Sequence, residues 1–199
     1  MITKVANVLT VFLVDRGIIS WEDIPVYVYG YEALIASVVN FILVLALGLM
    51  FHQGWQTIVF FVVFALTRIY SGGYHAQSYL KCNLVLAFVY IMTILLCKAI
   101  IYNESYYTIV VFVLFYLSVI LKFAPVPNVR KQMDNVERAR FRERILLLST
   151  FWTILTAILC FFSFTVALNV AITLFVVAVL IVIHQLLGRE EEIFSEKST

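Results

Sequence analysis

Two side chains that could form a nucleophile and its base lie seven residues apart in a polar stretch of this chain. They are Cys82, one of three cysteines, and His75, one of three histidines. The thiolate is the reactive form of a cysteine, and a neighbouring cation or a helix N-terminus favours it. Lys81 precedes Cys82, and Asn83 could cap a helix that begins after it. A histidine could take the thiol proton and later return one to a leaving amine.

The spacing of this pair requires the chain to bend. On one straight helix the side chains of His75 and Cys82 would share a face but lie about 10 Å apart, at ~1.5 Å per residue. That separation is too large for direct proton transfer. Gly72 and Gly73 could begin the bend, and backbone N–H groups there could approach a substrate carbonyl as oxyanion donors.

The group that would orient His75 is left open by the sequence. No Asp or Glu occurs between Glu32 and Glu104, so no carboxylate lies near the histidine along the chain. Either the pair acts as a dyad, or the orienting group is Gln77, Ser78, Asn83 or a distant residue. From the residues alone, an isolated histidine near a cysteine in a membrane loop is more often incidental than catalytic.

The composition indicates one all-α membrane domain over residues 1–199. The chain is 63% hydrophobic and 13% charged, with a mean hydropathy of +1.01, far from the usage of soluble domains. A net charge of +2 does not suggest nucleic acid as a partner. Three cysteines without a C-x-x-C pair form no disulfide or zinc pattern, and Cys97 and Cys160, each inside an apolar run, are expected to be packing residues.

We expect about six transmembrane helices, each near the 20 residues that a hydrocarbon core of roughly 30 Å requires. The apolar runs occupy residues 31–50, 55–66, 84–101, 106–121, 145–162 and 166–187. The second run is short and is closed by Arg68, so a re-entrant segment is the alternative. The tail, residues 189–199, is expected to fray.

Residues 1–20 are predicted to form an amphipathic helix that ends near Gly17. Its apolar positions recur at helical spacing: Ile2, Val5, Leu9, Phe12 and Leu13. Two placements are open for this helix, because it could lie on the membrane surface or pack on the protein's own membrane domain.

The basic segment 122–144 indicates the orientation in the membrane. It holds seven Lys or Arg residues against three acidic ones, and basic residues crowd the cytoplasmic loops of membrane proteins. Alternation of the spans then places the loop 68–82 and both termini inside the cell as well. The same charges could attract an acidic peptide segment.

The polar stretch also carries a family resemblance. Between two apolar runs the chain has, in order, Arg68, Gly72-Gly73, His75-Ala76 and Cys82. This order resembles the signature of the accessory gene regulator B (AgrB) family of Gram-positive bacteria. The amphipathic N-terminus, about six apolar segments and a basic loop that opens at residues 122–127 with Lys-Phe-Ala-Pro-Val-Pro extend the likeness to nearly the whole chain.

The resemblance implies a membrane cysteine endopeptidase that processes a small, amphipathic, AgrD-like quorum-sensing propeptide. Cys82 would attack at the C-terminal cleavage site with His75 as its base, and a propeptide cysteine or serine would close a thiolactone or lactone. The residues assigned to substrate binding, oxyanion binding or loop support are Arg68, Gly72, Gly73, Gln77, Ser78 and Lys81. Arg68 could instead anchor the second span at the headgroups.

The remaining expectations concern partners, location and rival functions. The protein would be a multi-pass protein of the bacterial cell membrane, in contact with lipid, and a homodimer is compatible with a domain this small. No metal or organic cofactor is expected, because no ligands cluster in the sequence. The alternative is a small peptide exporter or transporter without protease activity, but Glu32 and Lys98 lie near span ends and the span centres are almost uncharged. A non-catalytic membrane scaffold is the third possibility.

Overall fold

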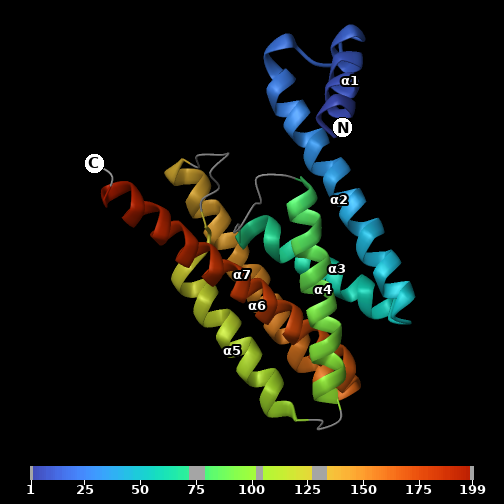
Figure 1. The fold of residues 1–199 in the computed structure, drawn as a ribbon, viewed down its shortest axis with the longest axis vertical. Coiled ribbons are helices and arrows are strands. Elements are labelled where there is room, and N and C mark those ends of the chain that lie inside the picture. Colours follow the sequence, from blue (N-terminus) through green and yellow to red (C-terminus); the bar gives the residue numbers. More distant parts are fainter. Residues whose placement is uncertain (1, 72–78, 102–104, 127–133, 198–199) are drawn as a thin grey trace.

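A computed structural model describes residues 2–71, 79–101, 105–126 and 134–197, and these form an all-α polytopic membrane protein with no strand in the described ranges (Figure 1). A short 3-10 helix, Trp21–Asp23, precedes α2. The seven α-helices are α1 (Ile2–Asp15), α2 (Ile24–Met50), α3 (Gly54–Ser71), α4 (Tyr79–Ile101), α5 (Tyr106–Phe123), α6 (Asn135–Phe162) and α7 (Phe164–Lys197).

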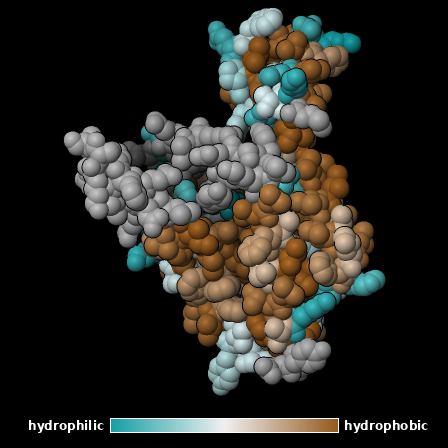
Figure 2. Space-filling model, viewed as in Figure 1, coloured by the Kyte–Doolittle hydropathy of each residue, from teal (hydrophilic) through white to brown (hydrophobic). Residues whose placement is uncertain are grey.

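Six of these helices, α2 to α7, are long and apolar enough to cross a membrane. The six predicted spans are therefore confirmed in number and order. The short second run is part of α3, whose 18 residues extend ~27 Å at ~1.5 Å per residue, close to the thickness of the hydrocarbon core. Apolar side chains cover the visible face of the bundle, and polar ones gather towards its ends (Figure 2).

Several helices continue beyond the apolar runs. The helix α2 begins at Ile24 rather than near residue 31, and α6 begins at Asn135, inside the basic segment. The prediction that residues 189–199 fray was wrong, because α7 continues to Lys197. Hydropathy marks only the part of a helix that lies in lipid, whereas Glu, Lys and Arg are good helix formers and extend it into water.

The helix α7 is the centre of the bundle. It contacts α3, α4, α5 and α6, and every residue from 167 to 174 is buried. A helix that is apolar on all sides is stable only when neighbouring elements surround it. These four spans therefore take their positions around α7, and α2 packs on α3 and α4.

The helix α1 packs on the N-terminal half of α2, and the two lie beyond the end of the bundle (Figure 1). The predicted packing on the protein's own membrane domain is present as this contact with α2, and a position of α1 on the membrane surface stays a prediction. The buried face is Ala6, Thr10 and Val14. Two residues of the predicted apolar stripe, Val5 and Phe12, stay 45% and 53% exposed. The apolar stripe is therefore left outside the contact between α1 and α2.

The helices α2, α3 and α4 meet closely at Gly48. The Thr57 hydroxyl forms a short hydrogen bond with the Tyr90 hydroxyl, and the Tyr90 ring lies 4.9 Å from the Phe60 ring. A Cβ atom on Gly48 would overlap the Thr57 side chain and lie 2.8 Å from the Tyr90 oxygen. The absence of a side chain at Gly48 is what allows α2 to approach the other two helices.

We expect Gly48→Ala to destabilise the fold by about 1–3 kcal/mol, the usual cost of an extra methyl group in a packed core. Thermal unfolding of the protein in detergent, followed by circular dichroism, measures this loss. The matched control is Gly30→Ala, on the same helix, where an added Cβ meets nothing within 4 Å. Equal melting temperatures for the two variants would contradict the close packing at Gly48.

Candidate active site

One end of the bundle gathers the last turn of α3, the first turn of α4, residues 124–126 and the N-terminal part of α6 (Figure 1). The Val126 N–H donates a hydrogen bond to the Ser71 carbonyl at 2.9 Å. The Tyr70 and Phe141 rings lie 6.0 Å apart. The predicted active loop 68–82 and the basic segment 122–144 are thus at the same end of the bundle, as the alternation of spans predicted.

Cys82 lies in the first turn of α4, as a half-buried free thiol. The prediction that Asn83 caps this helix was wrong, because α4 begins at Tyr79 and Asn83 is inside it. The first four N–H groups of a helix have no partner within the helix and carry the positive end of its dipole. Cys82 therefore lies at the positive end of the dipole of α4.

Arg68 supplies a second positive charge near this thiol. Its guanidinium interacts electrostatically with Cys82 and lies 5.7 Å from the centre of the Phe64 ring, and its Nη1 atom is buried. The side chain is thus directed into the protein rather than towards the headgroups. This supports a role for Arg68 in steadying the active loop over a role as an anchor for the span.

The segment after α5 forms a buried wall beside the end of α3. Ala124 and Val126 are 3% and 1% exposed, and Ser71 is fully buried. The Arg142 guanidinium donates hydrogen bonds to the carbonyls of Leu121 and Ala124, both at 3.4 Å. These bonds partner carbonyls at the end of α5 that the helix itself leaves open. Arg142 therefore fixes the segment that holds Ser71.

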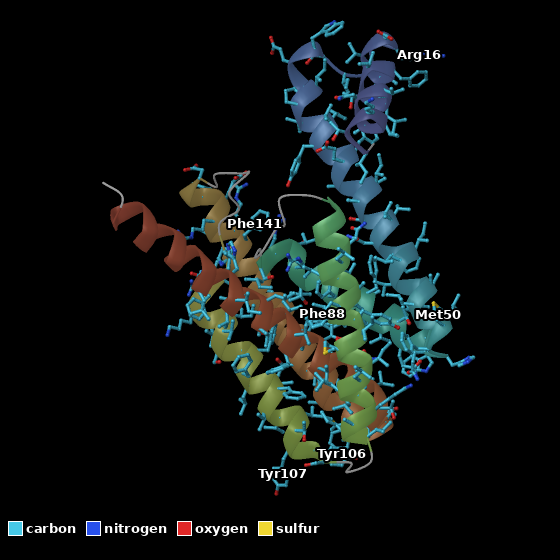
Figure 3. The ribbon with its side chains drawn as sticks, in the orientation of Figure 1. Arg16, Met50, Phe88, Tyr106, Tyr107 and Phe141 are labelled. Atoms are coloured by element: carbon cyan, nitrogen blue, oxygen red, sulfur yellow. The ribbon has the colours of Figure 1, made fainter. Side chains whose placement is uncertain are left out.

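Tyr70 joins α3 to α6 at the same place. Its ring contacts Phe141, and the Arg144 guanidinium lies 5.9 Å from its centre. Phe141 is at this end of the bundle, whereas Tyr106 and Tyr107 are at the opposite end (Figure 3). The sequence analysis missed these contacts. The resemblance pointed to residues 122–127, but no spacing along the chain connects residue 70 with residue 141.

Several predicted site residues lie outside the part of the chain that the structure describes. They are His75, Gly72, Gly73, Gln77 and Ser78. Lys81 belongs to α4, but its side chain is also outside the described part. The described residues contain no group of three or more His, Cys, Asp or Glu that could hold a metal ion. Of the predicted residues, Arg68 and Cys82 lie within range of an electrostatic interaction, and the pairing of Cys82 with His75 stays a prediction.

We expect Arg68→Gln to slow the alkylation of Cys82 by iodoacetamide about three- to tenfold, because the thiolate loses a neighbouring positive charge. The rate is measured by mass spectrometry in a Cys97→Ala/Cys160→Ala background, so that Cys82 alone reacts. The control is Arg138→Gln, which removes an exposed charge from α6. If Arg68→Gln reacts as fast as this control, Arg68 does not act on the thiol.

Comparison with known proteins places this arrangement in a family. The family model described as Accessory gene regulator B matches residues 4–186. An AgrB-like protein of Clostridium perfringens strain 13 is 29% identical over 144 residues, which is 68% of this chain and 67% of the relative. An AgrB-like protein of Clostridium beijerinckii is 28% identical over 151 residues, 75% of this chain and 73% of the relative.

A second Clostridium perfringens relative, from strain SM101, is 29% identical over 140 residues, 66% of this chain and 65% of its own length. No solved structure matches the chain. The family match runs from α1 to the centre of α7 and includes the ends of α3 and α4 that carry Arg68 and Cys82. On this ground the chain belongs to the accessory gene regulator B family, and its role is in the agr quorum-sensing system.

Proposed function

We propose that the protein is a membrane cysteine endopeptidase that cleaves the C-terminal tail from a small AgrD-like propeptide and promotes its cyclisation. The observation that carries this proposal is the position of Cys82, a half-buried free thiol in the first turn of α4 that interacts electrostatically with Arg68. Thiolates that act as nucleophiles in enzymes commonly lie in such partly exposed, electropositive surroundings.

In the first step, the Cys82 thiolate attacks the carbonyl carbon of the scissile peptide bond, and His75 holds the proton that the thiol has lost. Backbone N–H groups at Gly72 and Gly73 bind the oxyanion of the tetrahedral intermediate. When the C–N bond breaks, His75 returns its proton to the nitrogen, and the tail leaves with a free amine. The rest of the propeptide remains attached to Cys82 as a thioester.

In the second step, a cysteine or serine side chain of the propeptide attacks the thioester carbonyl. The new bond closes a thiolactone or lactone, the C–S bond to Cys82 breaks, and the proton of the attacking group passes through His75. Water would compete for the same carbonyl. The buried wall of Ser71, Ala124 and Val126 beside the site limits the access of water and supports cyclisation over hydrolysis.

Basic side chains at this end of the bundle support recognition of an acidic propeptide tail. The exposed ones among the described residues are Lys122, Arg138, Arg140, Arg142 and Arg144. Because basic residues crowd cytoplasmic loops, the same set supports a site that faces the cytoplasm from the cell membrane. In this proposal Gln77, Ser78 and Lys81 support the loop around the peptide. A homodimer is also part of the proposal, since α1 exposes apolar residues that a second copy could cover.

We expect purified protein in nanodiscs to cleave a co-encoded small propeptide and to form a thioester adduct at Cys82. Cys82→Ala removes the nucleophile and His75→Ala the base, so either change should lower the cleavage rate by at least about a hundredfold. Mass spectrometry of the peptide and of the protein measures both the cleavage and the adduct.

The matched control is Cys97→Ala/Cys160→Ala, which removes the two half-buried thiols outside the site and should cleave like the wild type. Circular dichroism shows whether each variant is folded. If Cys82→Ala and His75→Ala cleave as well as the wild type, the endopeptidase proposal fails, and a peptide exporter without protease activity becomes the better explanation.

We also expect the processed peptide to be mainly cyclic. A cyclic product weighs one water molecule less than the linear peptide, and hydroxylamine opens a thiolactone, so mass spectrometry before and after this treatment identifies the ring. Replacing the attacking cysteine or serine of the propeptide by alanine should leave cleavage but give only linear peptide. A linear product from the unchanged propeptide would refute the cyclisation step while leaving the endopeptidase in place.

A further inference from the structure

A small polar pocket lies at the end of the bundle opposite Cys82. It has a volume of about 110 Å³ and is lined by the first turns of α3 and α7 and the last turns of α4. Its polar lining residues are Gln53, Gln56, Cys97, Lys98, Thr165 and Asn169. Cys82 and Cys97 are fifteen residues apart on α4, so the pocket is ~22 Å from the active thiol along the helix.

Two carbonyl oxygens in this pocket have no hydrogen-bond partner in the described part of the chain. They are Oδ1 of Asn169, a residue only 6% exposed, and Oε1 of Gln56, which is also buried. A buried acceptor without a partner destabilises the fold, because it has lost its hydrogen bonds to water. Asn169 lies in the central helix α7. The arrangement points to a bound group that donates hydrogen bonds to both oxygens.

The charge of the pocket indicates that the bound group is anionic. Lys98 is the cation of the lining and lies in the last turn of α4, and among the described residues no carboxylate lines the pocket. An ammonium at this position attracts an anion, and phosphate is a common partner of lysine. The expected ligand therefore combines an anionic group with hydroxyl or N–H donors.

The depth of the pocket in the membrane indicates where such a ligand comes from. Trp55, in the first turn of α3, is 47% exposed, and Tyr106 and Tyr107 (Figure 3) are 53% and 85% exposed. Exposed Trp and Tyr residues mark the level of the lipid headgroups. The pocket opens at this level, and its volume suits part of a headgroup rather than a length of peptide.

We propose that this pocket binds the phosphoglycerol headgroup of an anionic membrane lipid of the phosphatidylglycerol type. The phosphodiester lies against the Lys98 ammonium, and the glycerol hydroxyls donate hydrogen bonds to the oxygens of Gln56 and Asn169. A choline headgroup has no N–H or O–H donor for these oxygens, and it places a second cation near Lys98. The site therefore discriminates between anionic, hydroxylated lipids and phosphatidylcholine.

The test uses the full chain in nanodiscs made from equal amounts of phosphatidylglycerol and phosphatidylcholine. Native mass spectrometry counts the lipids that stay bound after release from the disc. We expect the wild type to retain phosphatidylglycerol over phosphatidylcholine, and Lys98→Met and Asn169→Leu to lose at least two thirds of this retained lipid. The matched control is Lys122→Met, which removes an exposed lysine from the last turn of α5, at the other end of the bundle.

A second measurement, of the melting temperature, distinguishes loss of lipid binding at the pocket from poor folding of a variant and from lipid that binds elsewhere on the protein. Phosphatidylglycerol should raise the melting temperature of the wild type and of Lys122→Met, but not of Lys98→Met, whose exposed side chain can change without disturbing the core. Gln56→Leu replaces Asn169→Leu if the latter does not fold.

Three results would overturn the proposal. The first is equal retention of phosphatidylglycerol by Lys98→Met and the wild type. The second is equal retention of the two lipids by the wild type, which leaves the pocket to water. The third is stabilisation by soluble glycerol 3-phosphate as large as that by the lipid, which makes the ligand a soluble phosphate. None of these results depends on whether the propeptide is cleaved.

Discussion

The hydrocarbon core of a membrane can hydrogen-bond neither N–H nor C=O groups, so a chain that crosses it must satisfy its backbone within helices. Polar chemistry is then confined to the helix ends, where N–H and C=O groups are left over. Both proposed sites of this protein follow that constraint. Cys82 is at the beginning of α4, and the pocket around Asn169 is where α3 and α7 begin and α4 ends. The middle of the bundle between them is built mainly from apolar side chains.

The end of the bundle that carries Cys82 depends on contacts between segments far apart in the sequence. The bond from the Val126 N–H to the Ser71 carbonyl joins the segment after α5 to the end of α3. Arg142, from α6, holds that segment through the Ala124 carbonyl, and Tyr70 adds a ring contact to Phe141. Three helices are therefore fixed at the point from which residues 72–78 lead to Cys82.

The sequence predicted the features that depend on local pattern. Runs of apolar residues gave all six spans in order, and a nucleophile was placed at Cys82, which lies in the first turn of α4. The positions of the helix ends were less accurate, as Asn83 and Asn135 show, because a helix can continue through polar residues once it leaves the lipid. The contacts of Tyr70 with Phe141 and of Gln56 with the pocket around Asn169 could not be predicted, since they arise from the packing of helices whose relative positions no single sequence specifies.

Arg68 connects the stability of the end of the bundle that carries Cys82 with the proposed chemistry of this cysteine. A guanidinium stays protonated in proteins, so its burial beside Phe64 is costly unless an anion is near. In the proposed mechanism the thiolate of Cys82, with which Arg68 interacts electrostatically, is one such anion. Arg68 loses this neighbouring negative charge when the thioester forms, because the sulfur of Cys82 is then uncharged. Arg68 is next stabilised by the negative charge that develops on the carbonyl oxygen during the attack of the propeptide side chain. Its charge would therefore favour both the formation and the breakdown of the acyl-enzyme.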